Sequence, residues 1–380
     1  MRIGVNTVFL VPGRVGGSET YVIDTLRHAV PLRRDVEWVL FTNAENDGLL
    51  RERFGSEPNV SCEALGIRAS GKLARMVGEQ TALPLACHRR GVNLLWSPGY
   101  TAPLTGSFPQ VVSVLDMQYC EFPADFSVLA RIALRVIVPR AARRSRVVLT
   151  LSAFSRDQIV RYARVPLERI RVVHLGVDAV FAAPLSAAER EARVGRLVPA
   201  GPYVLSVANT HPHKNVAALV QAFGCLPGNP AVRLVLVGVE GRAEAEVRAA
   251  IRSSVRSDRI VRLAGLSRVD LVALYQGARC FAFPSLYEGF GLPVLEAMAA
   301  GVPTIAVRGG PLAEVGGDAV RYTDGSAGDL AEALAEMLAF PETVRLEWIE
   351  RGSRRAGEFT WARTARETLA CLLEAGKIPA

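Results

Sequence analysis

Short apolar runs of strand length alternate along this chain with longer segments that carry a helical pattern. Parallel strands of one sheet need crossover connections of about a dozen residues, usually helices, whereas antiparallel strands can be joined by short turns. The alternation therefore predicts doubly wound parallel sheets. The predicted strands cover residues 2–6, 37–42, 59–64, 94–97, 110–115, 147–152 and 170–174 in a first series, and residues 203–208, 233–237, 260–263, 280–283, 303–307 and 320–322 in a second.

The two series are separated near residue 180, where the run VVHLGVD is followed by turn signals and an alanine-rich polar segment. A chain of 380 residues also exceeds the size that one hydrophobic core usually supports. We therefore predict an α/β protein with two Rossmann-like domains, whose ligand-binding edges face each other across a cleft. An amphipathic C-terminal helix is predicted from the helical spacing of Trp361, Ala365, Leu369 and Leu372.

The stretch FPSLYEGFGLPVLEAMAAGVPTIAV, residues 283–307, passes from a strand end through a glycine-rich loop into an apolar helix. Gly291 allows a ligand to approach the backbone closely, and Pro293 suits the first turn of a helix. The first amides of that helix, around Gly291 and Leu292, lack intrahelical acceptors and lie at the positive end of the helix dipole. The stretch therefore predicts a phosphate site.

Two carboxylates, Glu288 and Glu296, flank this predicted phosphate site. A carboxylate repels a phosphate, so the partners that suit both residues are hydroxyl groups. A ligand with phosphates in the middle and hydroxyls on both sides is a nucleotide sugar. The alternative is that Glu288 is a solvated loop charge and Glu296 a helix-capping acid.

Lys214 lies in the loop THPHKN, between the first strand and the first helix of the second series. The chain has only three lysines among its 45 basic residues, so a lysine at this position indicates a need for a compact charge, such as a phosphate requires. His211 and His213 flank it and could donate to the same phosphate, but without carboxylate partners they make a poor metal site. Chance retention of the lysine is the alternative.

In the first series, Gly16 and Gly17 follow the first strand and open a helix. The carboxyl ends of parallel strands are where such sheets bind ligands, although a tight turn explains the pair equally well. The spaced GxGxxG pattern of dehydrogenases is absent from this turn. Asp116 follows the strand QVVSVL, where it could hold an acceptor hydroxyl or cap a turn.

The net charge of +8 is concentrated in the first half, since residues 1–178 hold 23 Lys and Arg against 16 Asp and Glu. Residues 130–146 interleave arginines with apolar positions, as in a helix that rests on anionic lipid; a solvated helix that covers the sheet is the alternative. These basic residues are not interleaved with aromatic residues, and the sequence contains no recognised nucleic-acid-binding motif, so nucleic acid is a weaker alternative. Six scattered cysteines without CxxC predict reduced thiols, no zinc site and a cytoplasmic protein, peripheral to the inner membrane face if that helix binds lipid.

Together these motifs resemble the retaining GT-B glycosyltransferases of family 4, also called group 1, and their mannosyltransferase-like subgroup in particular. EGFGLPVLEAMAAG, with FPSLY before it and VPTIAV after it, resembles the family signature. GLSRVDLVALYQGA is similar to the segment before the signature, SVANTHPHKN to the pyrophosphate-binding loop, VVHLGVD to the domain linker and GGSETYV to the N-terminal glycine-rich loop. The resemblance is strong over residues 203–325 and looser before residue 180.

The resemblance implies roles for the matching residues of the second domain. Glu296 is expected to bind the ribose hydroxyls of the donor, and Glu288 the hydroxyls of the transferred sugar. Lys214 is expected to bind the diphosphate, together with the backbone amides of Phe290, Gly291 and Leu292. Leu266 lies where the nucleobase contacts of the family fall.

For the first domain, the resemblance implies that Gly16 and Gly17 approach the donor phosphates or the acceptor. It also implies that the C-terminal helix crosses back onto this domain. The expected division is residues 1–180 plus 362–380 for an acceptor-binding domain, and residues 181–361 for a donor-binding domain.

Three positions depart from the family pattern. Many members have His-Asp where this chain has Leu115 and Asp116, and the histidine lines the reacting sugar. Many also have an arginine five residues before the lysine, where this chain has Asn209. His213 stands where part of the family has arginine, and we expect it to replace that charge in part.

The function implied is that of a metal-independent, retaining hexosyltransferase of class EC 2.4.1 with no cofactor. The expected donor is a nucleoside diphosphate sugar, GDP-mannose before UDP- or dTDP-sugars. The expected acceptor is a saccharide, a lipid-linked saccharide or a natural product, in bacterial glycan, polysaccharide or glycolipid synthesis. A sugar-nucleotide epimerase of the same architecture and a non-catalytic sugar-nucleotide-binding partner are the alternatives.

Overall fold

The computed structural model describes residues 1–228 and 231–377, which form two compact units. Unit 1 holds Met1–Gly176 and the C-terminal segment from Thr360, and unit 2 holds Val177–Phe359. The sequence placed the first boundary near residue 180 and the second after residue 361. The structure has them a few residues earlier, where the chain passes from one unit to the other.

Unit 1 is built on a seven-stranded parallel sheet in the order β3-β2-β1-β4-β5-β6-β7. Its strands are β1 (Arg2–Asn6), β2 (Glu37–Thr42), β3 (Val60–Ala64), β4 (Leu94–Ser97), β5 (Gln110–Ser113), β6 (Val147–Thr150) and β7 (Ile170–Val172). Its helices are α1 (Gly17–Ala29), α2 (Asp47–Phe54), α3 (Lys72–Gln80), α4 (Ala82–Arg89), α5 (Gln118–Glu121), α6 (Val128–Arg144), α7 (Ala153–Ala163) and α17 (Trp361–Lys377).

Unit 2 is built on a six-stranded parallel sheet in the order β10-β9-β8-β11-β12-β13. Its strands are β8 (Tyr203–Val207), β9 (Arg233–Val237), β10 (Ile260–Leu263), β11 (Cys280–Phe283), β12 (Thr304–Val307) and β13 (Val320–Thr323). Its helices are α8 (Ala179–Ala182), α9 (Ala187–Leu197), α10 (Val216–Gly224), α11 (Glu244–Ser253), α12 (Arg268–Gly277), α13 (Leu292–Ala299), α14 (Gly310–Gly316), α15 (Ala327–Leu338) and α16 (Glu342–Ala356).

The predicted strands of both series are confirmed, and the parallel pairing is confirmed throughout. Strands such as β4 and β12 are buried along their whole length, as expected for a sheet covered by helices on both faces. The direction of strand order reverses between β1 and β4 in unit 1, and between β8 and β11 in unit 2. Ligands of open parallel sheets bind at such reversals, beyond the carboxyl ends of the strands.

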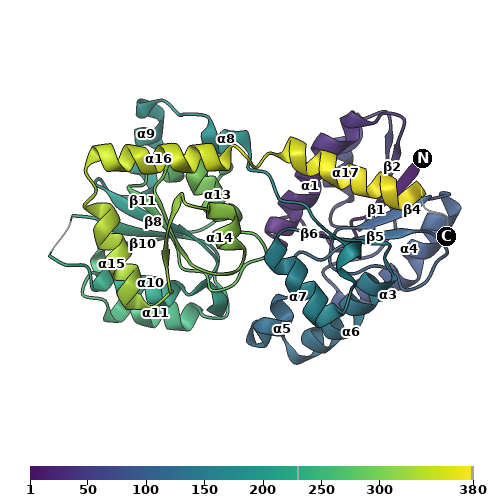
Figure 1. Ribbon diagram of the computed structural model, residues 1–380, viewed down its shortest axis with the longest axis horizontal. Helices are drawn as coiled ribbons and strands as arrows, with labels where there is room; N and C mark the ends of the chain where they lie inside the picture. Colours follow the sequence, from purple (N-terminus) through teal and green to yellow (C-terminus); the bar gives the residue numbers. More distant parts are fainter. Residues whose placement is uncertain (229–230, 378–380) are drawn as a thin grey trace. The chain divides into compact units, whose positions relative to one another are not determined.

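The C-terminal helix α17 belongs to unit 1, where it packs on α1 and on strand β4 (Figure 1). The predicted apolar stripe of this helix is buried, which confirms its spacing; the stripe consists of Trp361, Ala365, Leu369 and Leu372. None of the helices in the described ranges is both long enough and apolar enough to span a bilayer.

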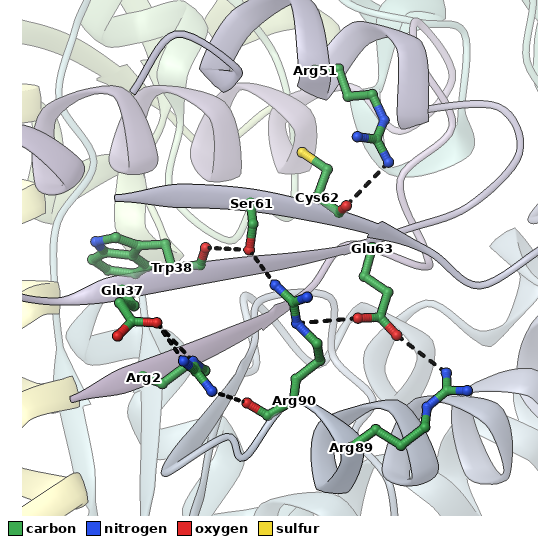
Figure 2. A network of polar contacts seen from close by, with 9 residues as sticks. All are labelled: Arg2, Glu37, Trp38, Arg51, Ser61, Cys62, Glu63, Arg89 and Arg90. Atoms are coloured by element: carbon green, nitrogen blue, oxygen red, sulfur yellow. Dashed lines mark hydrogen bonds and ion pairs between the residues drawn. The ribbon is translucent and has the colours of Figure 1, made fainter. Parts of the chain in front are cut away.

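A polar network joins strands β1, β2 and β3 of unit 1 to the end of α4 (Figure 2). Arg2 pairs with Glu37 across β1 and β2 at 2.6 Å, while Glu63 of β3 forms ion pairs with both Arg89 and Arg90, at 3.2 and 3.3 Å. The arginines of these pairs are 37 to 71% exposed, so each pair contributes little, about 0.2–1 kcal/mol. The network supports the sheet edge and includes none of the predicted site residues.

Candidate functional site

Two loops meet at the strand reversal of unit 2. One follows β8 and carries Lys214; the other follows β11 and carries Glu288. The amide of Leu286 in the second loop donates to the carbonyl of His213 in the first at 2.8 Å, and the hydroxyl of Ser285 donates to the same carbonyl at 3.3 Å. The two loops are therefore fastened to each other through the main chain.

This arrangement brings Lys214 and Glu288 together. The Lys214 ammonium donates to Glu288 Oε1 at 2.5 Å, and the two side chains are only 19 and 13% exposed. The same ammonium lies 5.6 Å from the centre of the Phe283 ring. A partly buried lysine is thus held at the carboxyl end of the sheet, with one carboxylate as its counter-ion.

Helix α13 begins directly after this loop. Gly291, its N-cap, has a φ of 113°, a left-handed conformation that side chains rarely adopt. A Cβ at this position would also lie 2.6 Å from a methyl carbon of Leu312. The first amides of the helix have no intrahelical acceptor, as at every helix N-terminus. Phe290, which precedes Gly291, is buried and packs edge-on against Phe359 at 5.9 Å, so its side chain anchors the loop while its backbone forms part of the helix start.

One turn into α13, Glu296 is half-buried and accepts a hydrogen bond from the hydroxyl of Tyr275 at 3.1 Å. Burial raises the pKa of Glu296 to about 7, although Tyr275 and the charge of Arg268 pull it in the opposite direction. Burial and the neighbouring carboxyl group raise the pKa of Tyr275 well above its usual value. Glu296 therefore changes its charge state near neutral pH.

A cavity of about 640 Å³ opens beyond the carboxyl ends of β9 and β10. At its wall, Arg262 donates to both oxygens of Glu244 at 3.1 Å, and Thr210 donates to Glu244 at 2.8 Å. Burial opposes ionisation of Glu244, but the hydrogen bonds from Arg262, Thr210 and Arg248 prevail and lower its pKa to about 2. The volume falls within the usual range for small-molecule sites.

The sequence did not predict this cavity. Its wall combines residues from three separate elements, Gly238–Glu240, Glu244–Arg252 and Arg262–Ala264. The only local signal is Gly238, whose φ is 155° and whose Cβ would lie 2.2 Å from the carbonyl oxygen of Ala208.

The remaining predicted residues of unit 2 lie in neighbouring loops. Leu266 is half-buried in the loop between β10 and α12. Asn209, at the position where many family members have arginine, is exposed and accepts the amide of Val239 at 3.0 Å. His213 is buried, 6% exposed, and its ring stacks on that of His211 at 5.9 Å. The His213 side chain thus packs within the loop.

In unit 1, the predicted residues lie at the carboxyl edge of the sheet. Gly16 has a φ of 53° and caps α1, which begins at Gly17. Asp116 follows β5, where its carboxylate accepts the hydroxyl of Tyr100 at 2.6 Å and the amide of Gln118 at 2.9 Å. Leu115 is buried, 5% exposed, and so packs in the interior. Asp116 is therefore partly occupied in shaping its own turn.

A carboxylate that the sequence did not single out lies at the same edge. Glu79 of α3 is buried and accepts Asn6 at 2.7 Å and the hydroxyl of Thr101 at 2.8 and 3.0 Å. Burial raises its pKa. In the sequence Glu79 looks like a surface charge of an amphipathic helix, because its partners come from distant segments, the end of β1 and the loop after β4.

Two family sequence models match consecutive parts of the chain. The model described as "Glycosyltransferase Family 4" matches residues 15–181, and the one described as "Glycosyl transferases group 1" matches residues 188–355. These ranges lie almost entirely within unit 1 and unit 2 respectively.

Individual proteins are similar over more limited stretches. The chain is 32% identical over 228 residues to O-antigen chain mannosyltransferase B of Escherichia coli. The aligned stretch covers 59% of this chain and 60% of that protein. The chain is 34% identical over 237 residues to an MMP alpha-(1->4)-mannosyltransferase of Mycolicibacterium hassiacum, 61% of this chain and 54% of that protein. The chain thus spans little more than half the length of these curated relatives.

The fold itself is shared over the whole chain with a solved structure, that of Anabaena Alr3699/HepE in complex with UDP and glucose. The TM-score is 0.77 at 21% identity, covering 98% of this chain and 100% of that one. Both units therefore have the architecture of the two halves of the GT-B fold. The chain belongs to the group 1 glycosyltransferases of family 4 and has their GT-B fold.

Proposed function

We propose that this protein transfers a hexose from a nucleoside diphosphate sugar to an acceptor hydroxyl, with retention at the anomeric carbon (class EC 2.4.1). The observation that carries the proposal is the half-buried Lys214–Glu288 pair beside the N-terminus of α13. A cation and a helix N-terminus suit a diphosphate, and a carboxylate beside them suits a sugar hydroxyl.

In this proposal Lys214 and the first amides of α13 bind the diphosphate. They stabilise the charge that develops on its oxygens as the glycosidic bond breaks, so the reaction does not depend on a metal ion. Glu296 accepts hydrogen bonds from the ribose, and Glu288 from hydroxyls of the transferred sugar. The cavity beside β9 and β10, together with the Leu266 loop, receives the base.

Retention follows if the acceptor attacks on the face that the diphosphate leaves. The bond between the anomeric carbon and the diphosphate oxygen breaks, the acceptor oxygen bonds to that carbon, and the acceptor proton passes to the departing oxygen. Asp116 then binds an acceptor hydroxyl or stabilises the developing charge. The second choice is a double displacement through Glu288, which needs its carboxylate directly under the anomeric carbon.

GDP-mannose is our first choice of donor, because both relatives are named as mannosyltransferases. A UDP-sugar is the nearest rival, since the similar fold of HepE was solved with UDP and glucose. A dTDP-sugar is the third. The acceptors we propose are saccharides, lipid-linked saccharides or natural products in bacterial glycan, polysaccharide or glycolipid synthesis, at a cytoplasmic site that includes the inner membrane face.

One observation favours a second function. Leu115 is buried and apolar where many family members have a histidine that lines the reacting sugar. A protein that binds the nucleotide sugar without transferring it would tolerate this change. An epimerase that inverts a centre of the bound sugar is the remaining alternative.

The test is to incubate purified protein with GDP-mannose, UDP-glucose or dTDP-glucose and a panel of saccharide acceptors, both with and without excess chelator, and to analyse products by NMR. We expect a new glycosidic bond with the anomeric configuration of the donor. An inverted bond would refute retention, and loss of transfer in chelator would refute metal independence. Binding of the donor without transfer would support a non-catalytic binding protein. A sugar nucleotide with one inverted centre, formed without acceptor, would support an epimerase.

A further inference from the structure

Helix α6, Val128–Arg144, belongs to unit 1 (Figure 1). It carries a row of exposed aliphatic side chains. Val128, Ile132 and Val136 follow one another at intervals of four residues and are 59, 54 and 44% exposed. Leu129, beside them, is 82% exposed. Because residues four apart lie one above the other on a helix, these side chains form one strip about two turns long.

The same ridge of the helix continues as arginine. Arg140 and Arg144 take the next two positions at the same interval, and Arg135 is exposed alongside. Helix α6 contains no aspartate or glutamate. Within the described ranges, neither Arg140 nor Arg144 forms an ion pair; their guanidinium groups donate to the carbonyls of Val136 and Gly106, at 3.0 and 2.5 Å.

The opposite face of α6 is already packed. Val138, Ala141 and Ala142 are buried in a core cluster with residues of β5, β6 and α7. The hydroxyl of Ser127 caps the helix by accepting the amide of Ala130 at 3.3 Å. Helix α6 is therefore anchored in unit 1 mainly through this opposite face, and polar substitutions at the most exposed positions of the strip are expected to leave the fold intact.

We propose that this face of α6 docks on an anionic lipid bilayer. The aliphatic strip enters the boundary between headgroups and acyl chains, and the arginines bind lipid phosphates. Interfacial helices combine a buried apolar row with basic residues whose long side chains reach the headgroups. Each arginine near an anionic membrane surface adds electrostatic attraction, which a neutral bilayer does not provide.

A second copy of this chain fits the face poorly. Two α6 helices paired in parallel would set arginines against arginines. Paired antiparallel, as a two-fold axis allows, they would set the arginines of each copy against the aliphatic strip of the other. Neither arrangement supplies an anion, whereas a bilayer with anionic headgroups offers both an apolar layer and phosphates.

The experiment measures binding of the purified full chain to vesicles by co-sedimentation, with neither donor nor acceptor present. One set of vesicles is pure phosphatidylcholine, and the other is equal parts phosphatidylcholine and phosphatidylglycerol. We expect binding to the anionic set only, weakened by added salt. Equal binding to both sets, or binding to neither, would overturn the proposal. Because no reaction is measured, the outcome is separate from that of the proposed transfer.

Two double variants with matched controls locate the surface. Leu129→Ser/Ile132→Ser is expected to weaken binding about tenfold or more through lost apolar burial. Its control replaces two exposed aliphatics of unit 2, as Val255→Ser/Leu346→Ser. Arg135→Ala/Arg140→Ala is expected to weaken binding about tenfold. Its control, Arg354→Ala/Arg366→Ala, replaces exposed arginines elsewhere. Unchanged binding in both α6 variants would overturn the proposal.

A further variant tests insertion by a new signal, so that the proposal does not depend only on loss of binding. Leu129→Trp places an indole at the most exposed position of the strip. Its fluorescence is expected to shift to shorter wavelength, relative to the wild type, when anionic vesicles are added. A spectrum that stays unshifted would contradict insertion. Analytical sedimentation tests the other occupant. If the wild type formed a dimer and Leu129→Ser/Ile132→Ser were a monomer, the partner of the strip would be a second copy of the chain, and the proposal would be wrong.

Discussion

At the scale of single residues, the Lys214–Glu288 pair dominates the site of unit 2. Each side chain is the other's counter-ion at 2.5 Å, and both are mostly withdrawn from solvent. In the proposed reaction, a bound diphosphate would offer Lys214 a second, doubly charged partner and would leave Glu288 able to accept sugar hydroxyls. The pair would then link occupancy of the phosphate position to the state of the sugar position.

Replacing Lys214 separates its role in stability from its role in catalysis. Lys214→Met leaves Glu288 without its cation, and we expect a loss of about 1–3 kcal/mol in the free energy of unfolding, less than for a fully buried pair. Turnover is expected to fall about a hundredfold. Urea unfolding and an initial-rate assay measure the two effects.

The double variant Lys214→Met/Glu288→Gln is the control. Without either charge, its stability is expected to return close to that of the wild type, while its turnover stays low. Recovery of activity together with stability would show that Lys214 acts only as a structural partner of Glu288.

The raised pKa of Glu296 predicts that the affinity for the donor depends on pH. Its pKa of about 7 in the ligand-free protein lies above the ordinary value of 4.5, so the carboxyl group holds a proton below neutral pH. In the proposed role, ribose hydroxyls donate best to the ionised form, so we expect donor binding to favour loss of the proton. Affinity is therefore expected to rise about tenfold between pH 6 and pH 8.

Calorimetry with an intact nucleotide sugar tests this, because a diphosphate esterified at both ends does not titrate in that range. In Glu296→Gln we expect weaker binding that is nearly independent of pH. The same shift makes the ligand-free wild type lose stability as pH rises from 4.5 to about 7, since the folded state binds the extra proton in that window. If the affinity of the wild type did not change with pH, the proposed role of Glu296 in binding the ribose would be wrong.

At the scale of elements, the turn from β11 into α13 is the feature on which the site depends. Gly291 combines a φ of 113° with a close approach to Leu312, so any side chain there is strained twice. Gly291→Ala is expected to cost about 1–3 kcal/mol and to weaken binding of a nucleotide sugar, because the helix start must shift. Thermal unfolding and calorimetry provide the readouts.

Gly195→Ala is the matched control in unit 2. Gly195 lies inside α9, is exposed, and a Cβ there would meet no atom within 4 Å. This change is expected to leave binding unaltered and to add about 0.5–1 kcal/mol of stability. If Gly291→Ala behaved like Gly195→Ala, the turn would not be the constraint that we describe.

The elements were predictable from the sequence where a local pattern carries the information. Strand positions follow from apolar runs, and the family resemblance assigned the Lys214 and Glu288 loops to one ligand. The cavity beside Glu244 and the enclosure of Glu79 could not be predicted, since each depends on residues from distant elements. The sequence showed that residues 130–146 interleave arginines with apolar positions, but not that the aliphatic strip of α6 stays uncovered.

At the scale of the whole molecule, the chain passes twice between the units, and a close backbone contact lies at these passages. Gly176, the last residue of the first segment of unit 1, has so little room that a Cβ would lie 2.1 Å from the amide nitrogen of Trp361. Nearby, the hydroxyl of Thr364 donates to the carbonyl of His174 at 2.7 Å. These contacts fasten α17 to unit 1.

Gly176→Ala is therefore expected to destabilise the protein by about 1–3 kcal/mol, because backbone atoms must move to admit the methyl group. Urea unfolding measures the change. Gly48→Ala, in helix α2 of the same unit, meets no atom within 4 Å and is expected to cost nothing. Equal stability of the two variants would show that the contact at Gly176 is not restrictive.

The central claim is that unit 2 binds a nucleoside diphosphate sugar through the loops of Lys214 and Glu288 and the helix that carries Glu296. Titration calorimetry of the full chain with GDP-mannose, UDP-glucose and dTDP-glucose, repeated for Lys214→Met and Glu296→Ala, tests it most directly. We predict one site that prefers one of these donors, with about tenfold or greater loss of affinity in each variant. Failure of all three to bind, or wild-type affinity in both variants, would contradict the account.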